Sequence, residues 1–254
     1  MHLRGMPLPL LCRRSTLISF VTLWLATTSP LALAADPTVG ATKYGNARFF
    51  RFHAEFLERA AKGNVDLLFL GDSITRGWAS QGEIWQEAWG EYRPANFGIG
   101  GDRTENVIWR IEQGELDKIS PRVVVLMIGT NNLASNDVAG IVAGNRRIVD
   151  LIQEKLPNAK ILLLGVFPRG PRNNWRGEVD PHEEFMRKIT EINAELAEWD
   201  NGETIRFLDL GPKFTSADGT IANAIMPDQL HLSAAGYEIW VEGMKPLVDT
   251  MMAD

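Results

Sequence analysis

The stretch Val65-Asp66-Leu67-Leu68-Phe69-Leu70, followed at once by Gly71-Asp72-Ser73, decides how this chain is built. A short apolar run that stops at a turn signal predicts a buried strand. Similar apolar runs recur at residues 95–98, 123–128, 161–167 and 205–210. Strands that are apolar throughout are typical of a parallel sheet whose two faces are both covered. The sequence therefore predicts five buried parallel strands.

Helical patterns lie between these runs. Residues 48–62 and 138–156 each place apolar side chains on one face of a helix. The segment Asp180-Pro181-His182-Glu183 is typical of a helix start, with Asp180 as the capping acid. A last helix is expected after Ser233. Strands that alternate with amphipathic helices predict an α/β fold, a three-layer α/β/α sandwich.

The N-terminal residues 1–34 have the three parts of a secretory signal peptide. Arg4, Arg13 and Arg14 precede an apolar run at residues 17–26, and Ala32-Leu33-Ala34 offers a cleavage site. An uncleaved membrane anchor is the alternative, but this run is short beside the roughly 20 residues that span a bilayer. We therefore predict cleavage after Ala34, a single domain at 35–254, a secreted or periplasmic location and no stable membrane anchor.

The composition is that of a globular protein. Of 254 residues, 45% are hydrophobic and 23% are charged, which rules out a disordered or collagen-like chain. Lys and Arg number 26 against 32 Asp and Glu, so the net charge of −6 disfavours a nucleic-acid partner. Signal cleavage would remove Cys12, the only cysteine. The mature chain would then have no disulfide, thiol nucleophile or cysteine-based metal site.

Three of the predicted strands end in glycine and small polar residues. These ends are Gly71-Asp72-Ser73, Gly98-Ile99-Gly100-Gly101-Asp102 and Gly129-Thr130-Asn131-Asn132. The carboxyl ends of parallel strands meet at one edge of the sheet, where ligands bind and exposed amides can donate to an anion. A phosphate or dinucleotide site is one interpretation, but the third glycine of that pattern falls at Arg103, and no Walker lysine motif occurs. The other is acyl transfer with Ser73 as the nucleophile.

A serine nucleophile needs a base, and after signal cleavage the histidines are His53, His182 and His231. His53 lies inside a predicted helix and His182 in a first turn, which favours structural or solvent-facing roles. His231 lies in a turn before the last helix, three residues after Asp228, so the carboxylate can orient the imidazole. A metal pair is the alternative, but no third ligand stands at a recognisable spacing. We expect Ser73, His231 and Asp228 to form a catalytic triad without a metal.

Four blocks of sequence between residues 66 and 237 carry a specific resemblance. They are Gly71-Asp72-Ser73-Ile74, Asn96-Phe97-Gly98-Ile99-Gly100-Gly101-Asp102, Gly129-Thr130-Asn131-Asn132 and Asp228-Gln229-Leu230-His231-Leu232. With these blocks the chain resembles the SGNH (GDSL-type) hydrolase family, most closely the catalytic subunits of intracellular platelet-activating-factor acetylhydrolase. The resemblance implies a flavodoxin-like sandwich and a serine esterase mechanism with no cofactor.

The resemblance also implies roles for single residues. Ser73 would be the nucleophile, and its own amide, the Gly101 amide and the Asn131 side chain would form the oxyanion hole. Asp228 and His231 would complete the triad. The chain departs from the family in its predicted secretion signal, which the intracellular acetylhydrolases lack, so their lipid substrate is not carried over. A homodimer would also fit the resemblance, although the sequence itself indicates no interface.

These features together predict a secreted serine esterase that removes a short acyl group, preferably acetyl, from a carbohydrate or a small alcohol. A lysophospholipase or thioesterase is the alternative within enzymes, and a catalytically idle binding module is the alternative outside them. Trp78 and Trp175 are the candidates for a wall of the substrate site. For Arg169, Arg172 and Arg176 we expect a solvated loop face, with recognition of an acidic substrate as the alternative.

Overall fold

The computed structural model describes residues 1–2, 35–174 and 176–253. Ala34–Asp254 form one compact unit. The predicted signal segment 1–34, apart from its first two residues, lies outside the described residues, and so does Trp175. Across the described ranges, no helix combines the length and the apolar character needed to cross a membrane.

The centre of the fold is a five-stranded parallel sheet with the strand order β2-β1-β3-β4-β5. Its strands are β1 (Leu67–Gly71), β2 (Pro94–Gly98), β3 (Val123–Met127), β4 (Lys160–Leu164) and β5 (Ile205–Leu208). The register sets Gly71 level with Gly98 on one side and with Met127 on the other. All five predicted strands are thus present, and the glycine-rich ends of the first three meet at one edge.

The fourth strand is shorter than its apolar run predicts. It ends at Leu164 rather than at residue 167. Beyond that point the side chain of Asn193 takes the place of a neighbouring strand: its Oδ1 accepts from the Val166 amide at 2.8 Å, and its Nδ2 donates to the Val166 carbonyl at 3.1 Å. The backbone therefore stays hydrogen-bonded after it has left the sheet.

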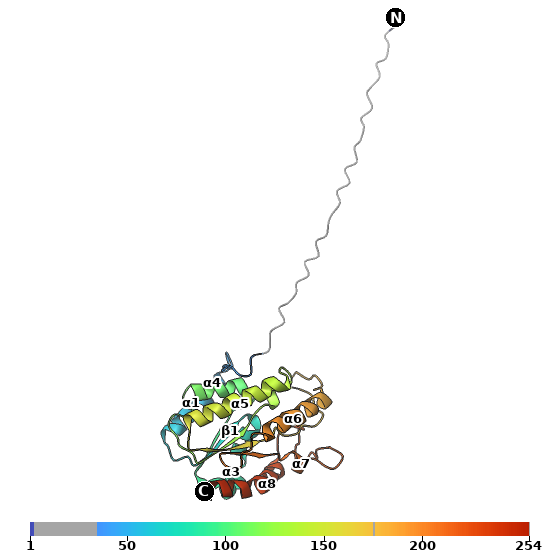
Figure 1. Cartoon of the computed structure of the whole chain (residues 1–254). Helices are drawn as coiled ribbons and strands as arrows, with labels where there is room; N and C mark the ends of the chain where they lie inside the picture. Colours follow the sequence, from blue (N-terminus) through green and yellow to red (C-terminus); the bar gives the residue numbers. More distant parts are fainter. Residues whose placement is uncertain (3–34, 175, 254) are drawn as a thin grey trace. The chain divides into compact units, whose positions relative to one another are not determined.

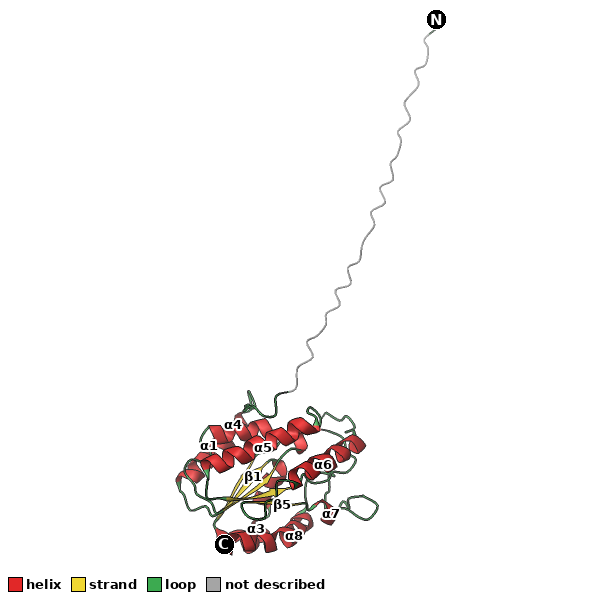
Figure 2. Ribbon diagram, in the orientation of Figure 1, coloured by secondary structure: helices red, strands yellow, loops and turns green. Residues whose placement is uncertain are grey.

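Helices cover both faces of the sheet, as Figures 1 and 2 show. One face carries α1 (Ala47–Ala61), α4 (Thr104–Glu112), α5 (Val138–Lys155) and α6 (His182–Ala197). The other carries α3 (Gly82–Trp89), α7 (Gly211–Phe214) and α8 (Ala234–Ala253). This arrangement confirms the three-layer sandwich.

Each face of the sheet buries its own apolar cluster. Successive side chains of a strand point to opposite faces. Accordingly Leu68 and Leu70 of β1 belong to the cluster that includes α1, α4, α5 and α6, whereas Leu67 and Phe69 belong to the cluster that includes α8. All four are fully buried. The end of β1, from which Ser73 follows, is therefore fixed from both sides by the core.

Trp78 belongs to the second cluster. Its side chain is 1% exposed, and its ring lies 4.5 Å from that of Tyr237 and 5.2 Å from that of Trp240, both on α8. The short helix α2 (Ser73–Arg76) and the turn after it direct this indole away from the end of the sheet and into the core. The prediction that Trp78 forms a wall of the substrate site is therefore wrong.

The start of α6 also differs from its predicted form. Pro181 is the residue that caps this helix, and no side chain supplies a capping hydrogen bond. Asp180, the expected capping acid, instead pairs with the Arg169 guanidinium. Because Arg169 lies near the start of the long loop after β4 and Asp180 near its end, their ion pair closes that loop on itself.

Candidate active site

The structure brings the three predicted triad residues together. Ser73 is the first residue of α2, two residues after the end of β1, and His231 lies in the loop before α8. His231 Nε2 is 2.9 Å from Ser73 Oγ, and His231 Nδ1 is 2.7 Å from Asp228 Oδ2. These two contacts form one continuous hydrogen-bonded chain from carboxylate to hydroxyl.

A tight turn holds the carboxylate against the imidazole. Asp228 Oδ1 accepts from the amides of His231 at 2.7 Å and Leu230 at 3.1 Å, which leaves Oδ2 for the ring. Burial pushes the pKa of Asp228 upward, but the hydrogen bonds from His231 and Leu230 outweigh it and hold that pKa below its usual value. An ionised carboxylate only accepts, so the ring proton resides on Nδ1. Nε2 is then free to accept the proton of Ser73.

The position of Ser73 depends on a close contact between β2 and α2. A Cβ atom at Gly98 would lie 2.4 Å from the amide nitrogen of Arg76. Any side chain at this position would therefore clash with the backbone of α2. Asp72 begins α2 and accepts from the Ile74 amide at 2.9 Å. The strand therefore passes into the helix within two residues, and the hydroxyl of Ser73 points out at the edge of the sheet.

Two backbone amides of residues that line the cavity around Ser73 can serve as oxyanion donors. They belong to Ser73 and to Gly101, whose φ of +72° is the left-handed conformation that favours glycine. Within the described ranges, no oxygen atom accepts a hydrogen bond from either amide. Both residues line the same cavity as His231. Their role in holding an oxyanion stays a prediction.

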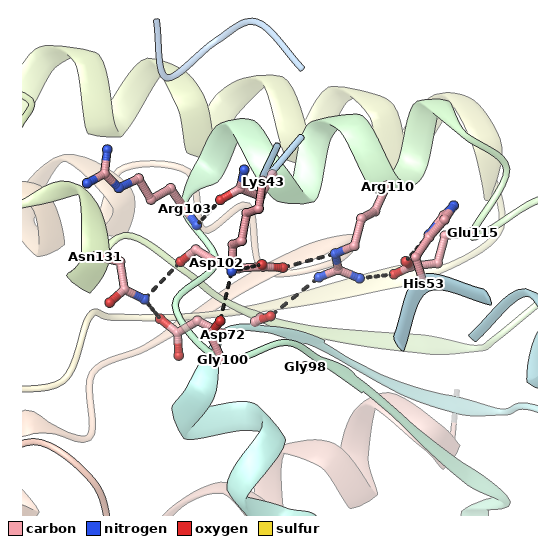
Figure 3. Close-up of polar contacts among 12 residues, drawn as sticks. Lys43, His53, Asp72, Gly98, Gly100, Asp102, Arg103, Arg110, Glu115 and Asn131 are labelled. Carbon is pink, nitrogen blue, oxygen red and sulfur yellow. Dashed lines mark hydrogen bonds and ion pairs between the residues drawn. The ribbon is translucent and has the colours of Figure 1, made fainter. Parts of the chain in front are cut away.

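Asn131, the third predicted donor, also lines this cavity, but its amide is engaged. Asn131 Nδ2 donates to the Asp102 carbonyl at 2.9 Å and lies 3.4 Å from Asp72 Oδ2 (Figure 3). These bonds tie the loops after β1, β2 and β3 to one another. To reach an oxyanion, Asn131 would exchange one of them for the substrate.

The cavity has a volume of about 520 Å³, and its lining is polar and apolar in about equal parts. Its polar side chains beyond the predicted site are Arg103, Thr130, Arg169, Arg172, Asn174 and Asp180, and its apolar ones are Ala134, Phe185 and Leu230. Arg169 is buried and Arg172 half-buried, so the expected solvated loop face is wrong for both, whereas Arg176 is exposed as expected. Arg172 also approaches Asp228 Oδ2 at 3.5 Å.

A buried charge network lies behind the site and was missed from the sequence. Arg110 of α4 is fully buried; its Nε donates to Asp102 Oδ2 at 3.0 Å, and its Nη1 pairs with Glu115 (Figure 3). His53 contacts the same Glu115 at 3.2 Å, which confirms a structural role for this histidine. The one available signal was an arginine on the apolar face of a helix, between Ile108 and Ile111.

Asp72 is fully buried between the nucleophile and this network. Burial, together with the negative charge of Asp102, raises the pKa of Asp72 to about 7, although the hydrogen bond from the Ile74 amide opposes that rise. An unfolded aspartate titrates near 3.9. The folded state therefore holds the proton more tightly than the unfolded state, and stability must fall as the pH rises from about 4 to about 7.

We expect Asp72→Asn to remove this pH dependence. Asparagine has no charge to bury and still offers an acceptor to the Ile74 amide, so it should stabilise the fold at pH 8, by at most about 4 kcal/mol, and should not do so at pH 4. Thermal unfolding at both pH values measures the difference. The same substitution at exposed Asp117 is the control. A gain of equal size at pH 4 and pH 8 would contradict the assignment.

Residues 69–239 match the GDSL-like Lipase/Acylhydrolase family. The chain belongs to this family. Platelet-activating factor acetylhydrolase IB subunit alpha1 of Bos taurus is 37% identical over 205 residues, which cover 80% of this GDSL-like acylhydrolase and 84% of the relative. Subunit alpha2 of Rattus norvegicus is 35% identical over 220 residues, 86% and 90% of the two chains. The protein is therefore a carboxylic ester hydrolase.

A solved structure has the same fold as this GDSL-like acylhydrolase. A GDSL-like lipase from Bacteroides thetaiotaomicron gives a TM-score of 0.64 at 19% identity, over 80% of this chain and 97% of that one. At such low identity the likeness concerns the fold alone. It agrees with the five-stranded parallel sheet and its helical layers.

Proposed function

We propose that this acylhydrolase is a secreted or periplasmic serine esterase that releases a short acyl group, preferably acetyl, from a carbohydrate or a small alcohol. Ser73 is the nucleophile, His231 the general base and Asp228 the residue that orients it. The supporting observation is the chain of contacts from Asp228 through His231 to Ser73, at 2.7 and 2.9 Å. Such a chain is what activates a serine hydroxyl, which is a weak nucleophile by itself.

The proposed reaction has two symmetrical halves. His231 Nε2 takes the proton of Ser73, Oγ attacks the ester carbonyl, and the developing oxyanion receives hydrogen bonds from the amides of Ser73 and Gly101. The imidazolium, stabilised by Asp228, then returns the proton to the departing alcohol. Water repeats the sequence on the acyl-enzyme and releases the acid. Asn131 adds a third donor by exchanging its bond to Asp102.

The lining of the cavity supports a short acyl group and a polar alcohol. Arg103, Arg169 and Asn174 offer polar contacts to an alcohol, and the apolar side chains that could receive the acyl group are Ala134, Phe185 and Leu230. Two relatives are acetylhydrolases by name. A lysophospholipase or thioesterase would need a longer apolar wall, and a binding module would not need an aligned base.

A panel of p-nitrophenyl esters from acetate to palmitate, run beside acetylated xylan and peptidoglycan, tests this proposal. We expect kcat/KM for the acetate to exceed that for the palmitate by at least about tenfold, because each added methylene must find apolar contact. A preference for palmitate would favour the lipase alternative. Sequencing the N-terminus of the exported protein tests the location, and we expect it to begin at Ala35.

A further inference from the structure

Lys43 reaches the site from a distant part of the chain. It lies before α1, 57 residues from Gly100, yet its Nζ donates to the Gly100 carbonyl at 2.7 Å (Figure 3). The same ammonium pairs with Asp102 Oδ1 at 2.6 Å, and its side chain is 15% exposed. It would lie 3.6 Å from a Cβ atom built on Gly101. A nearly buried cation thus sits directly behind one of the candidate oxyanion donors.

The Gly100 carbonyl, which Lys43 contacts, belongs to the same peptide group as the Gly101 amide. This peptide group is planar, and its electrons are delocalised from nitrogen to oxygen. A cation at the oxygen draws electron density toward it and leaves the N–H hydrogen more positive. Hydrogen bonds in series strengthen one another in this way. The charge also acts across a poorly hydrated region, where electrostatic interactions are weakly screened.

We propose that Lys43 is a positioning residue for ester hydrolysis: its ammonium fixes and polarises the Gly100–Gly101 peptide so that the Gly101 amide binds the oxyanion more strongly. This proposal rests on the proposed function above. The effect is confined to states that carry negative charge on the former carbonyl oxygen, so it lowers the barrier without tightening substrate binding.

An anchoring role alone does not account for this contact. The segment before α1 is already attached to α4 by other hydrogen bonds. The Ala41 amide donates to the Glu105 carbonyl at 2.9 Å, and Asn106 Nδ2 donates to the Ala41 carbonyl at 2.8 Å. Earlier in the segment, the Pro37 carbonyl accepts a hydrogen bond from Thr104 Oγ1 at 2.9 Å. The segment therefore keeps its place without Lys43, and a neutral side chain of similar length should be accommodated.

The test compares Lys43→Met with Lys43→Arg in the full chain. We expect Lys43→Met to lower kcat for p-nitrophenyl acetate by about 10- to 100-fold, less than the roughly 10²- to 10³-fold loss when an oxyanion donor is removed outright. KM should stay within about twofold. Lys43→Arg keeps the charge and should recover a large part of kcat. Titration with a fluorophosphonate counts the active sites, so that each rate refers to folded enzyme.

The control is Lys155→Met, because Lys155 forms an exposed ion pair with Asp117 at 3.0 Å. It should leave kcat unchanged. If Lys43→Met hydrolyses the ester with a wild-type kcat, the proposed role of Lys43 is overturned and the proposed function stands. Equal losses in the Met and Arg variants would overturn it too, because only shape would then matter. If the wild-type protein hydrolyses no ester, the proposed function fails as well.

The pH profile offers a second readout. Burial lowers the pKa of Lys43, the charges of Asp102 and Asp72 raise it, and Arg110 lowers it further, with a net shift downward. The ammonium, and the rate it supports, is therefore present at neutral pH and lost as the pH rises through that lowered pKa. Wild-type kcat should fall at alkaline pH, and Lys43→Arg should move this fall to higher pH. An unchanged alkaline limb in Lys43→Arg would count against the proposal.

Discussion

Ser73→Ala should reduce kcat for ester hydrolysis by about 10⁴-fold or more while leaving the melting temperature nearly unchanged. The hydroxyl is the atom that would bond to the acyl group, and it contributes little to packing at the edge of the sheet. The amides of Ser73 and Gly101 and the cavity remain in the variant. Substrate binding should therefore persist, and the loss should appear in kcat.

Covalent labelling makes this result specific. A fluorophosphonate should attach to Ser73 in the wild-type protein and fail to label the variant, as peptide mapping by mass spectrometry would show. Ser80→Ala is the matched control, because Ser80 is exposed and lies a short distance further along the chain. Full activity in Ser73→Ala, or a label on another serine, would contradict the assignment of the nucleophile.

Asp228→Asn is expected to lower kcat by about 10⁴-fold at neutral pH. Asparagine can still accept from the amides of His231 and Leu230, but its NH₂ group would face His231 Nδ1, where the carboxylate now accepts. The ring would then carry its proton on Nε2, which could no longer accept the proton of Ser73. The geometry would survive, whereas the base would be in the wrong tautomer.

Thermal unfolding separates this effect from a loss of structure. The variant should keep the melting temperature of the wild-type protein, because the amides of His231 and Leu230 still have their acceptor. Asp218→Asn, an identical change on an exposed turn closed by Thr220, is the control and should retain full activity. Wild-type activity in Asp228→Asn would refute the proposed function of Asp228.

The strands could be predicted because they are largely apolar runs, although β2 includes Asn96 and β5 includes Arg206. The run 65–70 ends in Gly71, and β1 does end there. The run 161–167 is equally apolar, yet β4 stops at Leu164 because a side chain of α6 replaces the neighbouring strand. An apolar run predicts that a segment is buried, but it does not predict which group supplies the hydrogen bonds of its backbone. The same limit applies to Asp180, which pairs with an arginine instead of capping its helix.

Short sequence motifs predicted the candidate catalytic residues, but they did not predict the residues that pack and pair around them. Asp228 and His231 are three residues apart, so one turn determines their contact. Lys43 and Gly100 meet only because α1 and α4 pack on the same face of the sheet, and no local pattern contains that information. Trp78 is the reverse case, since its closeness to Ser73 in sequence suggested a role that its packing against Tyr237 and Trp240 excludes.

The two hydrogen bonds between the Asn193 side chain and the Val166 backbone affect how this part of the molecule can unfold locally. The Gly165 amide still donates to Leu208 of β5 at 3.0 Å, but both backbone groups of Val166, the next residue, are bonded to Asn193 of α6. The arginine-bearing loop therefore starts from a residue that the helix holds. Native proteins open in cooperative units that follow such bonding. Fraying of α6 would therefore free the backbone of Val166 while β4 and its neighbours remain closed. Further on, the Gly170 amide donates to the Gln229 carbonyl at 2.9 Å, so the arginine-bearing part of the loop would stay attached to the turn that carries His231.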